Sequence, residues 1–343
     1  MKSSNRKIFI FFFIFFLFFS IITAVSVGTW PIPFFKVIGI IFHEMGFPIP
    51  ETWTPGERNI IIFLRLPRIL MALIVGAMLS VSGVAAQALF RNPIADPYIL
   101  GISSAAGSGV ALTVVLGVTA LFGLFTMPIV SFLFSITAVM IVYRLAMTRY
   151  QVSISILLLS GLAVSFFFSA CTSLLLYFAE NSAHYILVFI MGSLNGTSWD
   201  DLFIVYIVLF FGGTLLFYYG RDLNVMVFGD ETAQSMGVNV EITKKIVIIC
   251  MTILTSTAVA FCGSIGFIGL IVPQIMRLLV GNDNRKLILL SALGGGLLLL
   301  WADLLARSLL PPLEIPVGIF TSLMGGPFFI YLILKKKKTG ELL

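Results

Sequence analysis

The sequence predicts an all-α polytopic membrane protein with about ten transmembrane helices. Its composition is the first reason: 59% of the 343 residues are hydrophobic and only 10% are charged. A soluble domain carries about 25% charged residues. The second reason is length, since about 20 residues per crossing leave room for about ten spans and their loops. We expect residues 1–343 to form a single transmembrane domain.

The apolar runs give the expected order of the spans. The first run is rich in Phe and follows a short basic N-terminus. It exceeds the roughly 7–15 apolar residues of a signal-peptide core, so we expect it to stay as the first helix. The predicted spans are residues 8–27, 69–89, 100–119, 125–143, 154–178, 202–219, 246–262, 267–279, 287–306 and 317–334.

The basic residues set the orientation of these spans. If the N-terminus lies inside and the spans alternate, 16 of the 21 Lys and Arg residues face the cytoplasm. This distribution agrees with the positive-inside rule, and an even number of spans places both termini in the cytoplasm. The net charge of +6 is therefore explained by loops beside the bilayer, and we expect no nucleic-acid partner.

Two segments between spans are long enough to carry structure of their own. The extracytoplasmic segment 28–64 is rich in Pro and aromatic residues, and 38–43 could form a short amphipathic helix at the interface. The cytoplasmic segment 221–245 is polar. In it Asp230 could cap a short helix that Gly237 ends, with a second short element after it. The bilayer does not require such a structure.

The apolar segment 263–286 has the features of a short, broken helix buried among others. Pro273 removes a backbone donor and kinks a helix, which is tolerated in a membrane where neighbouring helices satisfy the freed carbonyl. Gly266 and Gly269 are three residues apart and would leave one helix face bare for close packing. Arg277 marks the water interface.

No motif in the chain indicates an enzyme. There is no Gly-Lys pair, so the chain contains no P-loop of the GxxxxGK[ST] type. No set of His, Cys, Asp and Glu has metal-ligand spacing, and the three cysteines sit in apolar runs as packing residues. We expect no catalytic residue, no metal and no cofactor bound by this chain.

Ionisable residues at membrane depth would indicate an ion-coupled carrier, which is the alternative function. Asp303 is the best candidate for such a residue. However, Arg307 lies four residues later on the same helical face, and a mutual ion pair is the simplest interpretation. A transporter without an internal ion relay must obtain its energy from another source.

Three arginines stand out on the extracytoplasmic side, where positive charge is scarce: Arg65, Arg68 and Arg307. They could anchor the helices by extending toward lipid headgroups. They could equally be fixed docking points for carboxylates of an extracytoplasmic partner, because Arg pairs with carboxylates in bidentate fashion. Charge alone leaves both interpretations open.

Several long motifs follow one another almost end to end. They include RLPRILMALIVGAMLSVSGVAAQALFRNPIADPYILGISSAAG (65–107), LLLSGLAVSFFFSACTSLLLYFA (157–179), MGSLNGTSW (191–199), GDETAQSMGVNV (229–240), GFIGLIVPQIMRLLVGNDNR (266–285) and ADLLARSLLPPLEIPVGIFTSLMGGPFFIYLI (302–333). With these motifs the chain resembles the permease subunits of binding-protein-dependent ABC importers for iron–siderophores, haem and cobalamin. This is the FecCD, or type II importer, group.

The resemblance implies a type II ABC importer permease fold in the cytoplasmic (inner) membrane. Two permease subunits, identical or paralogous, would form a translocation path at their interface. Two separate ABC ATPase subunits would bind the cytoplasmic face and use ATP, and an extracytoplasmic substrate-binding protein would deliver the cargo. The expected cargo is an iron–siderophore complex, haem or a cobalamin-like compound.

The resemblance also implies roles for residues that match the family's motifs. Arg65, Arg68 and Arg307 match positions that meet glutamates of the binding protein. Two further sets match the ATPase-coupling segment and the cytoplasmic gate. The coupling residues are Gly229, Asp230, Glu231, Ala233, Met236 and Gly237, and the gate residues are Asn92, Ile94, Ser153 and Ser155. Many family members have His where this chain has Gln274, which cannot titrate near neutral pH.

Overall fold

The computed structural model describes residues 16–28, 30–148, 151–310 and 313–339. In these residues the chain is almost entirely helical, and the β-pairing is limited to an isolated bridge between Met147 and Val152. Six of the described helices are long and apolar enough to cross a membrane, and four shorter ones are apolar. Each of these ten helices overlaps one of the ten predicted spans. The start of the first predicted span, 8–15, lies outside the described residues.

The helices that correspond to the ten spans lie close to their predicted positions. Only the α7 bounds agree at both ends, and α9 and α11 extend several residues further toward the cytoplasm than predicted. Their bounds are Phe16–Ser26, α4 (Leu66–Leu89), α5 (Ile102–Val115), α6 (Thr126–Ala146), α7 (Ile154–Phe178), α9 (Trp199–Met226), α11 (Val240–Cys262), α12 (Ile268–Val280), α13 (Asn284–Ser308) and α14 (Val317–Thr339).

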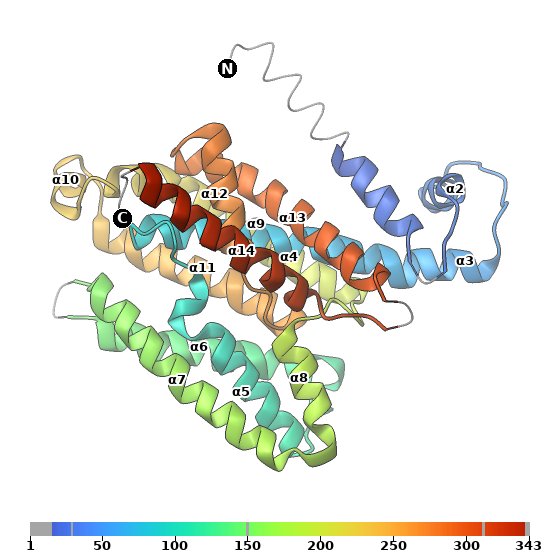
Figure 1. Cartoon of the computed structure of the whole chain (residues 1–343), viewed down its shortest axis with the longest axis horizontal. Coiled ribbons are helices and arrows are strands. Elements are labelled where there is room, and N and C mark those ends of the chain that lie inside the picture. Colours follow the sequence, from blue (N-terminus) through green and yellow to red (C-terminus); the bar gives the residue numbers. More distant parts are fainter. Residues whose placement is uncertain (1–15, 29, 149–150, 311–312, 340–343) are drawn as a thin grey trace, which may run out of the picture.

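Helix α4 is the centre of the larger of two helix groups. It packs against α9, α11, α12 and α13, and Figure 1 shows these helices gathered around it. A second group, formed by α5, α6, α7 and α8 (Ala183–Met191), lies on one side of the first. The two groups meet mainly where α6 and α5 pack against α11. The sequence did not predict α8, because its nine residues are too few for a span.

Glycines let α4 approach its neighbours backbone to backbone. A Cβ atom on Gly76 would lie 2.2 Å from the Gly295 carbonyl oxygen of α13. A Cβ atom on Gly83 would lie 2.0 Å from the Gly269 carbonyl oxygen of α12. Small residues at membrane helix interfaces allow such contact. The close packing predicted for Gly269 is therefore confirmed.

The start of α12 differs from the prediction. The helix begins at Ile268, after Phe267 in the left-handed region at φ +67°. Gly266 therefore precedes the helix and does not share a face with Gly269, so that part of the prediction was wrong. Pro273 lies inside α12 and is buried among its neighbours, as expected.

The extracytoplasmic segment is shorter than the predicted 28–64. Helix α2 (Phe34–Glu44) covers the expected amphipathic stretch, but α3 (Pro55–Asn59) and the π-helical turn η1 (Ile60–Arg65) continue directly into α4. Thr54 and Glu57 form a capping box that starts this helix. Arg65, Pro67 and Arg68 separate the apolar residues 60–64 from the run that starts at 69, which is why the sequence prediction began the span too late.

The cytoplasmic loop is also shorter than the predicted 221–245. Because α9 continues to Met226 and α11 begins at Val240, the loop is confined to 227–239. It contains the short helix α10 (Asp230–Ser235), whose N-cap is Gly229 and not Asp230. Gly237 has φ +85° and follows the end of α10, as expected. The prediction of a second short element after Gly237 was wrong, because residues 240–245 form the first turns of α11.

Candidate functional site

The three outer arginines lie together at one end of the helix bundle. Arg65, Arg68 and Arg307 line a cavity of about 240 Å³ together with Glu314. They come from η1, α4 and α13, so the fold brings together residues that are more than 200 positions apart in the sequence. The sequence identified the three arginines but not Glu314.

Arg68 is the centre of this outer cluster. Its Nη2 atom lies 2.8 Å from Oδ1 of Asp303, and its Nη1 atom lies 2.7 Å from Oε2 of Glu314. Nη1 also donates to the side-chain oxygen of Asn195. The Asp303 side chain is only 2% exposed, whereas that of Glu314 is 32% exposed. Arg68 therefore joins a buried carboxylate to one that water can reach.

The side chains of Arg65 and Arg307 donate hydrogen bonds to backbone carbonyl oxygens. Arg65 Nη1 donates to the Val25 carbonyl oxygen at 2.7 Å, and Arg307 Nη2 donates to the Ala24 carbonyl oxygen. Both arginines are buried. They tie the end of the Phe16–Ser26 helix to η1 and α13.

Asp303 does pair with Arg307, as predicted, but the prediction missed its main partner. Arg307 Nε lies 3.6 Å from Asp303 Oδ2, which is longer than each of the contacts from Arg68. The main partner of Asp303 is thus on α4 rather than on its own helix. Helical periodicity shows only neighbours on the same helix and could not reveal this.

A second cluster lies at the cytoplasmic ends of the helices, and we call it the Asp230 network. The Asp230 carboxylate accepts from Lys244 Nζ at 2.7 Å and from Arg91. Lys244 Nζ also lies 3.0 Å from Glu241 Oε1. The other oxygen of Glu241 accepts from the Val152 amide at 3.0 Å. The network therefore joins α10 to the end of α4, the start of α11 and the segment before α7.

The Asp230 network contacts residues beside both predicted gate segments. Arg91 precedes Asn92, whose side-chain oxygen accepts from the Ile94 amide at 2.9 Å and closes a local turn. Val152 precedes Ser153, which caps α7. Ser155 is exposed on the first turn of that helix. Sequence reasoning missed the partners of Asp230, although the i, i+3 spacing of Glu241 and Lys244 is a pairing signal.

The remaining residues predicted to couple to the ATPase lie on α10 and at its ends. Ala233 is the buried residue of α10, whereas Glu231 is exposed. Met236 is 67% exposed, and Phe228, which the sequence analysis did not single out, is 76% exposed. The loop 227–239 thus presents large apolar side chains to the cytoplasmic side.

Gln274 on α12 has a clear structural partner. Its side-chain amide donates a hydrogen bond to the Pro93 carbonyl oxygen, between Asn92 and Ile94. This bond needs a donor and no titratable group. Gln274 therefore holds one predicted gate segment against α12.

Within the described residues, six helices long enough to cross a membrane and four shorter apolar ones, with polar clusters at both ends of the bundle, have the architecture of a polytopic membrane protein. The chain belongs to the FecCD transport family, whose sequence profile matches residues 15–335. It is a permease of the ABC importer class. This membership decides against the ion-coupled carrier that the sequence left as the alternative.

Individual relatives agree with this assignment. The chain is 39% identical to the cobalamin import system permease protein BtuC of Halobacterium salinarum, over 90% of this chain and 82% of that protein. It is 40% identical to the hemin transport system permease protein HmuU of Yersinia pestis, over 80% of this chain and 83% of that protein. A solved structure described as an inward-facing metal-chelate type ABC transporter has a TM-score of 0.81 and 31% identity. That match covers 95% of this chain and 98% of the other.

Proposed function

We propose that this permease carries an iron–siderophore complex, or haem or a similar metal chelate, across the cytoplasmic membrane. Two ABC ATPase subunits power it, a second permease subunit completes the path, and an extracytoplasmic binding protein delivers the cargo. The cargo class is supported by relatives named for hemin and cobalamin. The observation that carries the mechanism is the Asp230 network, because it joins the cytoplasmic loop to residues beside both gate segments.

The ATPase binds the apolar tip of the loop 227–239. Phe228 and Met236 are the exposed apolar side chains there, and burying each in a partner groove contributes about 1.5–3 kcal/mol. Ala233, the buried residue of α10, packs the helix against the rest of the permease. Motion of α10 then reaches Arg91 and Lys244 through the Asp230 carboxylate. These contacts carry the motion to the gate segments at Asn92 and Ser153.

The binding protein docks on the outer cluster through Arg68. Because Arg65 and Arg307 bond to the backbone, they position the cluster and supply positive charge. Three guanidinium groups there face two carboxylates, so one positive charge is left over within the cluster. A carboxylate of the binding protein takes the place of Glu314 on Arg68 Nη1, which is the side of the cluster nearest to water.

Capture of the ATPase tests the apolar tip. The double variant Phe228→Ser/Met236→Ser should lose co-purification of the ATPase encoded with this permease. The matched control is Leu124→Ser, because Leu124 is 93% exposed but lies in the loop before α6. Equal capture by the tip variant and the control would refute the proposed ATPase contact.

Affinity for the binding protein tests the outer cluster. Replacing Glu314 by Gln removes the internal competitor for Arg68 and should strengthen binding, whereas Arg68→Gln should weaken it. Arg58→Gln is the control, since Arg58 is an outer arginine that pairs with Glu44 away from the cluster. If Glu314→Gln weakens binding as much as Arg68→Gln does, the exchange of carboxylates is wrong.

Competition among cargoes tests the substrate class. Cells that depend on this permease should take up a ferric siderophore or haem, and an excess of that compound should block uptake of the labelled form. Failure of every such metal chelate, cobalamin included, to be taken up or to compete for uptake would overturn the proposed cargo class.

A further inference from the structure

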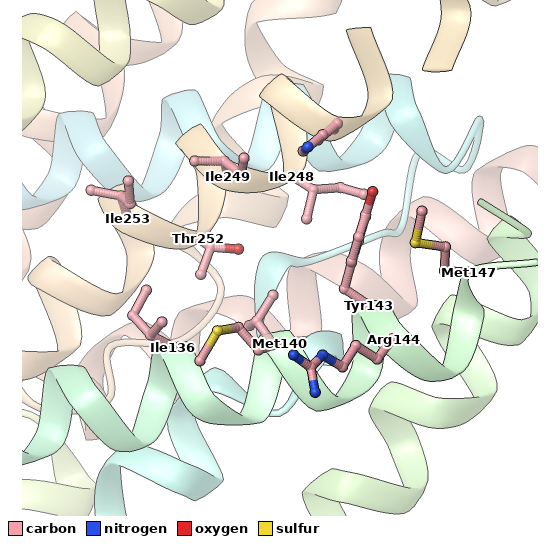
Figure 2. Close-up of a pocket in the computed structure, with 11 residues that line it drawn as sticks. Ile136, Met140, Tyr143, Arg144, Met147, Ile248, Ile249, Thr252 and Ile253 are labelled. Atoms are coloured by element: carbon pink, nitrogen blue, oxygen red, sulfur yellow. The ribbon is translucent and has the colours of Figure 1, made fainter. Parts of the chain in front are cut away.

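An apolar groove follows the line where α6 packs beside α11. Its cytoplasmic half is a cavity of about 510 Å³, and Figure 2 shows side chains from both helices around it. Its outer half is a second cavity of about 330 Å³ along the same two helices, with α9 closing one side. On α6 the lining continues from Ile136 to Phe132, and on α11 from Ile253 to Thr257. These steps are one helical turn, so the two cavities lie end to end.

The groove walls are almost entirely hydrocarbon. Met140 lines it from α6 and Ile249 from α11, and Thr252 is a buried polar residue of the lining. Met140 is 53% exposed and Ile249 is 46% exposed. Cavities of about 300–1,000 Å³ with apolar walls are typical of ligand sites in proteins. A groove of this shape at membrane depth fits an extended acyl chain.

The cytoplasmic end of the groove has a different chemistry. Arg144, in the last turn of α6, and Lys245, near the start of α11, both line the cavity there. Both side chains are exposed, and neither forms an ion pair with any carboxylate in the described part of the chain. The neighbouring Lys244, by contrast, is buried in the Asp230 network. Two uncompensated positive charges thus stand at the mouth of an apolar groove.

We propose that this groove binds an anionic phospholipid of the cytoplasmic leaflet. One acyl chain lies between α6 and α11, and the phosphate lies between Arg144 and Lys245. The guanidinium of Arg144 offers two parallel donors to phosphate oxygens, and the Lys245 ammonium adds a point charge. Basic residues at the cytoplasmic surface attract anionic lipids in the same way. The charge at the groove mouth favours an anionic headgroup over a zwitterionic one, and the site does not depend on which cargo the permease carries.

Native mass spectrometry of the full-length protein in detergent tests this proposal. The protein is incubated with phosphatidylglycerol or with phosphatidylcholine that carries the same acyl chains. Wild type should retain phosphatidylglycerol in preference, and Arg144→Gln/Lys245→Gln should lower its affinity for that lipid by about tenfold or more. The same variant should lower retention of phosphatidylcholine much less, because the choline ammonium already offsets the charge of its phosphate. Equal retention of both lipids by wild type would overturn the proposal.

A matched charge control separates the groove from general surface charge. Arg221→Gln/Lys286→Gln removes the same charge from the cytoplasmic ends of α9 and α13, outside the groove lining. It should leave retention of phosphatidylglycerol at the wild-type level. A decrease equal to that of the groove variant would mean bulk attraction and would refute a defined site.

Filling the groove tests the acyl-chain half of the proposal. Ile249→Trp narrows the cavity from an exposed position and should lower retention of both lipids. Ile242→Trp is its control, because Ile242 is also exposed on α11 but does not line the groove. If Ile249→Trp instead abolishes association between two copies of the chain and leaves lipid retention unchanged, the groove is a subunit contact and the lipid site is wrong.

Discussion

Arg68 on α4 donates three hydrogen bonds of 2.8 to 3.1 Å to the carboxylate of Asp303 on α13. The two residues are 235 positions apart. Their contact lies at the outer end of the helix pair that Gly76 and Gly295 bring into backbone contact. The ion pair and the glycine contact together fix α4 against α13.

Removing the charge of Asp303 should strongly destabilise the protein. In Asp303→Asn the guanidinium groups of Arg68 and Arg307 lose their buried partner, and breaking a buried pair costs about 3–5 kcal/mol. A lower thermal-unfolding midpoint in detergent is the expected result. Glu314→Gln is the control, because this carboxylate is partly exposed and its loss should cost less than about 1 kcal/mol. Equal shifts for the two variants would contradict a dominant role for Asp303.

Adding a methyl group to Gly83, where α4 meets Gly269 of α12, should also destabilise the fold. The Cβ atom of Gly83→Ala would meet the Gly269 backbone, so the helices must separate at a cost of about 1–3 kcal/mol. Gly213→Ala serves as the control, because its Cβ atom would only meet Leu209 at 3.5 Å. This control should be neutral or slightly stabilising, since Ala favours a helix over Gly. A neutral Gly83→Ala would show that the backbones are further apart than described.

Asp230→Asn should separate capture of the ATPase from transport. The variant keeps the apolar tip for ATPase capture but loses the charge that holds Arg91 and Lys244, so uptake should fall while capture persists. Glu231→Gln is the matched control, because Glu231 is exposed on the same helix and forms no ion pair in the described residues. Uptake by the proteoliposome-reconstituted complex measures the effect. Wild-type uptake in Asp230→Asn would refute the role of the network.

The Asp230 network should persist in mild acid. Burial raises the pKa of Asp230, but the hydrogen bond and charge of Lys244 and the charge of Arg91 outweigh it and hold the pKa below its usual range. A folded pKa below the unfolded value of about 3.9 stabilises the protein above that pH, and the stabilisation is lost as the pH falls through the folded pKa. The stability difference between wild type and Asp230→Asn should therefore stay constant from about pH 7 to pH 5 and shrink below about pH 4. A difference that vanishes near pH 6 would be incompatible with this network.

Gln274 should act as a hydrogen-bond donor. Gln274→His keeps a donor toward the Pro93 carbonyl oxygen and should retain most uptake, whereas Gln274→Glu places a carboxylate against that oxygen and should lose it. Uptake at neutral pH by cells that express each variant is the measurement. Full activity of Gln274→Glu would mean that the bond to Pro93 is dispensable.

The sequence predicted those features that depend on neighbouring residues. Within the described residues, hydropathy located the ten apolar helices. Gly237 indicated the end of α10 because glycine readily adopts the positive φ that such a turn requires. The helical residues before α4 were missed because Arg65, Pro67 and Arg68 separate them from the apolar run that starts at 69. The Thr54–Glu57 capping box was the signal that could have revealed it.

The candidate sites were only partly predictable. Scarce positive charge on the outer side singled out Arg68, a capping position singled out Asp230, and the family resemblance gave each a role. Their partners Asp303, Glu314, Arg91 and Lys244, however, come from other elements of the fold. No periodicity in one sequence shows contacts between helices that are far apart in the chain. The burial of Arg65 and Arg307 against backbone carbonyls was hidden for the same reason.

The account depends most on the claim that this permease is powered by ATP from partner subunits. Proteoliposomes that contain the chain with its second permease and ATPases, loaded binding protein outside and ATP inside, test it directly. We predict uptake of the iron chelate that requires hydrolysable ATP and is absent with the permease alone under a proton or sodium gradient. Uptake by the permease alone under such a gradient would contradict the account.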